Sequence, residues 1–147
     1  MQKEVNQTWF FTQSPQEVWE YLTKPELIEQ WLMKTDFQPT VGHKFSFTHA
    51  SKNESPYDGA TQCEVLEVEP FAKLSYSWKG GLKDGSRTYD SKVIWTLVPK
   101  ENGTELQLEH NGFKVLEDIL AHNSGWNSCL KRFETLINTT KNVNANA

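Results

Sequence analysis

The stretch "NSGWNSCLKRFETLIN", residues 123–138, carries the clearest helical pattern in the chain. Its large apolar residues recur at intervals of three or four, as Trp126, Leu130, Phe133 and Ile137. This spacing places them on one face of a helix, in a stripe wide enough to cover a sheet. The same spacing continues backwards to about residue 116. The sequence therefore predicts a long helix near the C-terminal end, packed on strands that must come earlier.

The same region also suggests chemistry, because Cys129 follows His122 by seven residues, and a cysteine with a histidine is a common pair of nucleophile and base. Seven residues of an ideal helix span about 10 Å, which is too far for a hydrogen bond between thiol and imidazole. No third residue at a recognisable spacing orients either side chain. We therefore interpret Cys129 as a half-buried structural residue and predict no catalytic residue.

Short alternating segments separated by turn residues occupy the middle of the chain. They are "HKFSFTH", "TQCEVLEVEP", "KLSYSW", "SKVIWTLVP" and "KENGTELQLEH", between residues 43 and 110. In the last segment Leu106, Leu108 and His110 share one face and polar residues share the other, which is typical of an antiparallel sheet with one buried side. The Asn102-Gly103 step between two alternating runs predicts a tight hairpin.

The N-terminal part predicts one strand and two short helices. "VNQTWFF" (5–11) alternates as a strand does. In "SPQEVWEYL", Ser14 is the expected N-cap, Pro15 the first helical residue and Glu17 the partner in a capping box. "TKPELIEQW" repeats the pattern, with Thr23 as the expected cap and Glu26 three residues later.

This order of elements predicts an α+β fold. We expect a curved antiparallel sheet of about six strands, wrapped around the long C-terminal helix, with two short helices after the first strand. Residues 1–138 are expected to form a single domain, and 139–147 a disordered tail because they contain too few apolar residues to pack. Segments 50–60 and 79–90 are rich in turn formers and charge, and we interpret them as mobile loops.

The composition limits the possible partners and locations. The chain has 147 residues and a formal net charge of −4, without a basic run, which argues against nucleic acid or an anionic membrane as a partner. Residues 1–13 contain no apolar stretch of the kind expected in a signal peptide, and no segment approaches the about 20 apolar residues that span a bilayer. We therefore expect a cytoplasmic protein with Cys63 and Cys129 reduced. Six tryptophans suit either a core or a ligand-lined cavity.

Several segments taken together resemble a known family. They are "SPQEVWEYLTKPELIEQW", "VGHKFSF", "CEVLEVEPFAKLSYSW", "SKVIWTLVPKENGTELQLEHNGF" and "GWNSCLKRFETLI". Their order resembles that of the START-like (helix-grip, SRPBCC) superfamily, and within it the activator of heat-shock protein 90 ATPase homologue group is the most similar. The resemblance spans about residues 5–138 and implies the helix-grip fold.

In that family the sheet and the long helix enclose a deep, mostly apolar cavity, and the resemblance implies one here. The residues that it places on the cavity wall are Trp19, Trp31, Phe45, Phe47, Cys63, Tyr76, Trp78, Trp95, Leu108, His110, Trp126, Leu130 and Phe133. Among the tryptophans, we favour Trp31, Trp78 and Trp126 as walls. Cavities of this kind commonly hold hydrophobic or aromatic small molecules.

The histidines have alternative interpretations. His110 could bind a ligand or act as a general base at the cavity mouth. We favour a structural histidine bonded to a backbone carbonyl near the end of its strand. His43 and His49 share a strand face but lack a third converging ligand, so we predict no metal site.

Three glutamates in the segment 61–70 could suggest acid–base chemistry. Alternation would put Glu67 and Glu69 on the same face as Cys63. We instead expect a β-bulge that changes the register before Pro70 and leaves solvated carboxylates.

Three functions are compatible with these observations, and we rank them. The first is binding of an unidentified small hydrophobic or aromatic molecule in the cavity. The second is a protein-interaction module like the heat-shock protein 90 co-chaperone. The third is a cavity enzyme of the cyclase or hydrolase kind, which would use His110, Tyr76 and His49. We favour binding over catalysis, expect neither cofactor nor metal, and expect a monomer or a homodimer.

Overall fold

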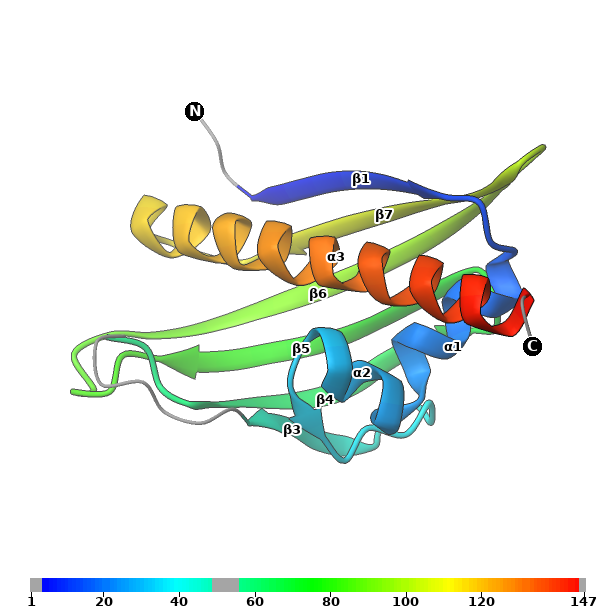
Figure 1. The fold of residues 1–147 in the computed structure, drawn as a ribbon. Coiled ribbons are helices and arrows are strands. Elements are labelled where there is room, and N and C mark those ends of the chain that lie inside the picture. The colour runs from blue at the N-terminus through cyan, green and yellow to red at the C-terminus, as the bar shows by residue number, and fades with distance from the viewer. Residues whose placement is uncertain (1–3, 49–55, 146–147) are drawn as a thin grey trace.

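The computed structural model describes residues 4–48 and 56–145 and places one sheet against a long C-terminal helix (Figure 1). The elements in chain order are β1 (Val5–Phe11), α1 (Pro15–Thr23), α2 (Pro25–Trp31), β2 (Lys34–Thr35), β3 (Lys44–Thr48), β4 (Ala60–Glu69), β5 (Lys73–Gly81), β6 (Thr88–Lys100), β7 (Gly103–Asn111) and α3 (Leu116–Ala145). The predicted α+β order, with two short helices after the first strand, is confirmed.

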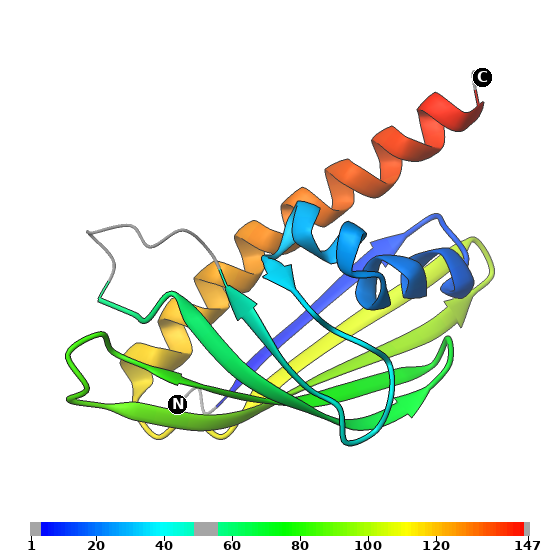
Figure 2. The same cartoon turned by 90° about the horizontal axis from the view of Figure 1, so that it is seen from below.

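The sheet has seven strands in the order β1-β7-β6-β5-β4-β3-β2, and every neighbouring pair is antiparallel. It curls around α3, which lies along its inner side (Figure 2). The prediction of about six strands lacked β2, which has two residues and is too short to show alternation. The arrangement is the expected helix-grip fold.

The β6–β7 hairpin turns where the sequence predicts it. Lys100 pairs with Gly103, so residues 101 and 102 make the turn. Gly103 has a φ of 152°, and a Cβ atom there would collide with the carbonyl oxygen of Phe11. Glycine therefore allows the end of β1 to approach the hairpin closely.

Two other expectations about the strands have different outcomes. The register of β4 against β5 shifts between Val65 and Glu67, which confirms the predicted bulge. The segment 79–90, which we expected to be a loop, pairs at both ends, because β5 runs to Gly81 and β6 begins at Thr88. Of the other expected loop, residues 50–55 lie outside the described part of the chain.

The two short helices begin differently. Ser14 Oγ accepts a hydrogen bond from the Glu17 amide at 3.2 Å, and Glu17 Oε1 accepts one from the Ser14 amide at 3.5 Å, which is the predicted capping box. The N-cap of α2 is Lys24, without a side-chain bond. Thr23 does not cap α2, because its hydroxyl donates to the carbonyl oxygen of Trp19 at 2.8 Å.

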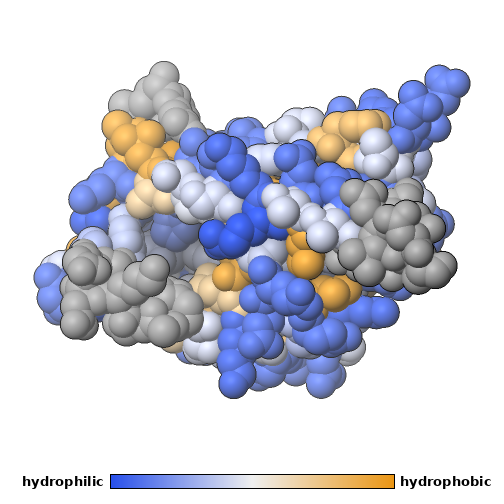
Figure 3. Space-filling model, viewed as in Figure 1, coloured by the Kyte–Doolittle hydropathy of each residue, from blue (hydrophilic) through white to orange (hydrophobic). Residues whose placement is uncertain are grey.

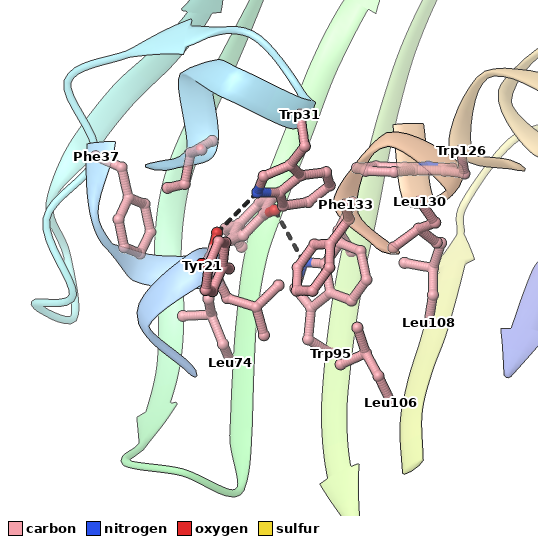
Figure 4. Packing of buried hydrophobic residues seen from close by; sticks show 14 of the residues in the cluster. Tyr21, Trp31, Phe37, Leu74, Trp95, Leu106, Leu108, Trp126, Leu130 and Phe133 are labelled. Carbon is pink, nitrogen blue, oxygen red and sulfur yellow. Dashed lines mark hydrogen bonds between the residues drawn. The ribbon is translucent and has the colours of Figure 1, made fainter. Parts of the chain in front are cut away.

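The core is a cluster of aromatic rings between the sheet and the helices (Figure 4). The ring centroid of Phe133 in α3 lies 4.9 Å from that of Phe11, 5.6 Å from Tyr21 and 4.9 Å from Trp31. Trp31 Nε1 also donates to the carbonyl oxygen of Tyr21 at 2.8 Å. In the apolar pattern predicted on α3, Trp126, Leu130, Phe133 and Ile137 are buried, whereas Leu116 and Leu120 near the start of the helix are exposed.

The helix α3 begins at Leu116 and is assigned as far as Ala145. It therefore extends past residue 138, where we expected the folded domain to end. The domain boundary at 138 and the character of 139–147 stay predictions.

The face of the molecule in Figure 3 is mostly hydrophilic, with small separate hydrophobic areas. Among the described residues, the exposed large hydrophobic side chains are Phe10, Val41, Leu66, Phe71, Leu116 and Leu120. Within the described part of the chain, no helix combines the length and the apolar character needed to cross a membrane.

Candidate functional site

A pocket of about 190 Å³ lies between α3 and the sheet. The helix α3 and the strands supply Thr61, Trp78, Tyr89, Ala121, His122, Gly125, Trp126 and Cys129, and the connecting segments supply Leu32, Met33, Tyr57 and Asp58. Thr61, Trp78 and Trp126 are buried and form its base, whereas the other residues are half-buried or exposed. A cavity of roughly 150 Å³ holds one benzene molecule, so this pocket has the size of a single substituted ring.

Five of the twelve residues that line the pocket carry aromatic rings. The centroids of Trp78 from β5 and Trp126 from α3 are 5.2 Å apart. The ring of His122 lies 6.3 Å from Trp78, 5.0 Å from Tyr89 and 5.9 Å from Tyr57. Such a wall offers both ring faces and ring edges, which favours contact with another flat ring.

A chain of buried hydrogen bonds runs behind the two tryptophans. Trp126 Nε1 donates to His110 Nδ1 at 2.9 Å, and Ser91 Oγ donates to the carbonyl oxygen of Trp78 at 2.7 Å. The contact between His110 Nε2 and Ser91 Oγ is 2.8 Å. Because an indole N–H only donates, His110 Nδ1 must accept, so Nε2 carries the proton and donates to Ser91. The chain ties both tryptophans to β6 and β7.

His110 is held neutral in this arrangement. Burial lowers its pKa well below the ordinary value, and the neighbouring His122 lowers it further. A second ring proton would also face the indole N–H of Trp126. These contacts fit the predicted structural role of His110. The predicted hydrogen bond to a backbone carbonyl was wrong, because the two ring nitrogens bond to the Ser91 hydroxyl and to the Trp126 indole N–H.

The second histidine of this region, His122, lines the pocket itself. Its Nδ1 donates to the carbonyl oxygen of Asp118, four residues earlier, at 2.8 Å. Burial lowers the pKa of His122, and in the neutral ring Nε2 is then an acceptor. Cys129 Sγ accepts a hydrogen bond from Arg132 Nη2 at 3.2 Å, and burial raises the pKa of its thiol. His122 Nδ1 and Cys129 Sγ thus each bond to a group other than the other side chain.

An ion pair holds the pocket together at the start of α3. Arg87 donates from Nε and Nη2 to the two carboxylate oxygens of Asp118, at 3.0 and 2.8 Å, and Tyr57 Oη donates to Asp118 Oδ1 at 2.9 Å. The Asp118 side chain is only 1% exposed. Burial by itself raises its pKa, but the hydrogen bonds from Arg87 and Tyr57 outweigh burial and hold the pKa below the ordinary value. The β5–β6 connection and Tyr57 are thereby joined to the first turn of α3.

In the described part of the chain, no three His, Cys, Asp or Glu side chains converge in a way that could hold a metal ion. His43 Nε2 donates to the carbonyl oxygen of Asp36 at 3.0 Å instead. His49 lies outside the described residues.

The structure separates the residues expected on the cavity wall into two groups. Trp78 and Trp126 line the pocket. The others are buried in the core without lining it: Trp19, Trp31, Phe45, Phe47, Cys63, Tyr76, Trp95, Leu108, His110, Leu130 and Phe133. They pack on one another, as Phe45 does on Tyr76 with centroids 5.3 Å apart, and so fill the space themselves. Which residues contact a ligand stays a prediction.

Several lining residues did not emerge from the sequence. Tyr57 and Tyr89 lie in the segments interpreted as loops. One sequence pattern could have indicated the pocket. On α3, His122, Gly125 and Cys129 lie at intervals of three and four residues, so they share a helix face beside the buried stripe. A Cβ atom on Gly125 would meet nothing within 4 Å, so this glycine leaves open space in the pocket wall.

A curled antiparallel sheet that grips a long helix, with a small aromatic pocket between them, defines a START-like protein of the helix-grip class. The profile of the family described as "Activator of Hsp90 ATPase homolog 1-like protein" matches residues 12–138. The chain belongs to this family.

Solved structures of relatives have the same fold. The MLL2253 protein of Mesorhizobium loti is 36% identical, with 94% of this chain and 98% of that chain covered and a TM-score of 0.83. The AHSA1 protein of Silicibacter pomeroyi is 18% identical, with 93% and 99% covered and a TM-score of 0.79. The Aha1 dimer of Colwellia psychrerythraea is 18% identical, with 92% and 96% covered and a TM-score of 0.72. The last two show the fold alone. No curated protein is similar enough in sequence to match this chain.

Proposed function

We propose that this protein binds a small apolar molecule, of about the size of one substituted ring, in the pocket between α3 and the sheet. The observation that carries this proposal is the pocket itself, with Trp78 and Trp126 at its base. Concave apolar sites with a few polar groups are the usual form of small-molecule sites. The volume of about 190 Å³ suits a single ring better than an extended lipid chain.

Binding is favoured over catalysis because the tyrosine, histidine and cysteine side chains of the pocket wall are held in their neutral forms. Burial raises the pKa of Tyr89 to about 12, raises that of the Cys129 thiol and lowers that of His122. Two of the three residues on which a cavity enzyme would rely make hydrogen bonds inside the core, and the third, His49, lies outside the described residues. His110 is bonded on both ring nitrogens, and Tyr76 Oη accepts from Trp95 Nε1 at 2.9 Å.

Titration with α-methylstyrene, a phenyl hydrocarbon, tests the proposal through the emission of the pocket tryptophans. We expect a saturable change in the wild type. Gly125→Leu fills the pocket from α3 and should weaken binding by about tenfold or more. Ser124→Leu places the same bulk on an exposed neighbouring residue outside the pocket and should bind as the wild type does. The proposal fails if the wild type shows no saturable response, or if both variants lose binding equally.

A second function is action on a chaperone of the heat-shock protein 90 type. Its support is the family description, which names an activator of that ATPase. The test is the ATPase rate of the purified chaperone with and without this protein. An unchanged rate at saturating protein would remove this function.

We also propose a cytoplasmic location and leave two oligomeric states, monomer and homodimer, to be measured. Both cysteines, Cys63 and Cys129, are free, as is usual in a reducing compartment. The Colwellia relative is described as a dimer, which supports the homodimer. Light scattering of the purified protein distinguishes the two states.

A further inference from the structure

One ring nitrogen of the pocket wall has no partner in the described part of the chain. His122 Nδ1 lies 2.8 Å from the carbonyl oxygen of Asp118, which only accepts, so Nδ1 carries the ring proton. In the neutral ring the other nitrogen, Nε2, then has a lone pair and no proton. No donor among residues 4–48 and 56–145 bonds to it. The pocket wall therefore holds an unused acceptor.

This nitrogen can be reached by a molecule in the pocket. His122 is half-buried and lines the pocket, beside the rings of Tyr57, Trp78 and Tyr89. Because Nδ1 faces the backbone of α3, Nε2 on the other side of the ring points away from that backbone. Among the described residues, the fully enclosed polar atoms without partners belong to other side chains, so His122 Nε2 keeps accessible surface.

A second polar group, at the base of the pocket, also lacks a partner among the described residues. Thr61 lies on the inner face of β4 and lines the pocket, and it is only 7% exposed. Its hydroxyl oxygen makes no hydrogen bond in that part of the chain and is not fully enclosed, so its open surface faces the pocket. A buried hydroxyl without a partner destabilises the protein. Both polar groups favour an occupant that is more than a hydrocarbon.

The charges around the pocket limit which donor can serve Nε2. No lysine or arginine lines the pocket among the described residues, and the carboxyl group of Asp58 lies at its exposed rim, so an anionic ligand would find no counter-ion there. A cation would lose its hydration against the apolar base. A phenol avoids both costs, because its hydroxyl has a pKa of about 10, as in tyrosine, and donates its proton while neutral.

We propose that the pocket selects phenols, and that the phenolic hydroxyl donates its proton to His122 Nε2. This inference rests on the proposed binding function and names its ligand class. The ring of the phenol packs against Trp78 and Trp126, and the centroid of the His122 ring lies 6.3 Å from that of Trp78. A hydrocarbon of the same shape displaces water from Nε2 without replacing its hydrogen bond, so it binds less tightly.

The test uses two probes of nearly equal shape. p-Cresol carries a hydroxyl group where p-xylene carries a methyl group. Titration calorimetry measures both affinities, and we expect p-cresol to bind about three- to tenfold more tightly. The imidazole ¹⁵N spectrum reports the bond itself, because a ring nitrogen that accepts a hydrogen bond moves upfield. We expect p-cresol to move the His122 Nε2 signal in this direction and p-xylene to leave it without an upfield shift.

Two variants separate His122 from the rest of the pocket. His122→Phe keeps a flat ring but removes the acceptor, so it should abolish the preference for p-cresol and retain binding of p-xylene. Thr61→Val keeps the shape of the base and removes only its hydroxyl, so it should retain the preference. The His122 signal is identified by its loss in His122→Phe, or in His122→Gln if the first variant does not fold.

The outcomes distinguish this inference from the binding function. Equal affinity of the wild type for p-cresol and p-xylene, or an unmoved His122 Nε2 signal with p-cresol bound, overturns the inference and leaves the binding function intact. A preference that is lost in Thr61→Val but kept in His122→Phe also overturns it. If p-cresol, p-xylene and α-methylstyrene all fail to bind, the binding function and the inference fall together.

Discussion

Two histidines, the buried His110 behind the pocket and the half-buried His122 in its wall, make folding sensitive to acid. Burial lowers the pKa of both His110 and His122 in the folded protein. In the unfolded chain a histidine binds a proton near pH 6.5. The unfolded state therefore holds more protons than the folded state once the pH falls below about 6.5. The stabilisation from the neutral histidines is complete above that pH and is lost as the pH falls further.

We predict that the free energy of unfolding decreases below about pH 6.5 by up to about 1.4 kcal/mol per pH unit for each of these histidines. His122→Gln removes one titrating group and should make the decrease shallower. Urea unfolding at a series of pH values measures it. Val93→Ala is the control, because Val93 is buried opposite His110 in β6 and its loss lowers stability without removing a histidine. An unchanged pH slope in His122→Gln contradicts the prediction.

The side on which a residue lies could be predicted from the sequence, but its partners could not. Alternation with Leu106 and Leu108 places His110 on the inner face of its strand. Ser91 and Trp126 reach His110 only because β6 pairs with β7 and α3 packs over both. No local pattern encodes those contacts.

Among the elements, predictability followed the strength of the periodic pattern. The buried stripe of α3 and the long strands were predicted because their apolar residues repeat over many positions. The pocket-lining stripe of α3 mixes His122, Gly125 and Cys129, which resembles a solvent-facing side. The ends of β5 and β6 contain glycine and charge, so their pairing depends on neighbouring strands and not on local preference.

The first turn of α3 depends on Asp118, and this leads to a prediction. Asp118→Asn keeps the shape of the side chain but removes the charge that pairs with Arg87. We expect a lower melting temperature, because one partner of a pair that includes a buried carboxylate remains without its counter-ion. We also expect faster amide hydrogen exchange in the first turns of α3 and in residues 82–87, measured by mass spectrometry.

The neighbouring glutamate provides a matched control for this change. Glu117 lies 3.4 Å from Arg87 Nη2, but its side chain is 74% exposed. Exposed ion pairs contribute little, so Glu117→Gln should leave both the melting temperature and the exchange close to those of the wild type. Equal exchange in the two variants would show that Asp118 does not hold this end of the helix.

At the scale of the whole molecule, one buried cluster extends along β1, from the pocket at the Val5 end to the aromatic packing around Phe133 at the Phe11 end. Val5 pairs with His110, which is bonded to the pocket residue Trp126. Phe11, at the other end of β1, packs on Phe133 of α3. One sheet and one helix thus form both the pocket and the packing around Phe133, and Phe11 contacts only the latter.

Phe11→Ala should therefore lower global stability without changing the pocket. We expect a loss of about 3–5 kcal/mol, the usual cost of removing a buried phenylalanine, and one cooperative transition in which tryptophan emission and circular dichroism change together. Phe10→Ala is the control, because Phe10 is 50% exposed, and it should cost less than about 1 kcal/mol. At temperatures where Phe11→Ala is folded, its affinity for α-methylstyrene should match that of the wild type, since distant sites act independently. Two separate transitions, or a loss of binding in the folded variant, would show that core and pocket are coupled.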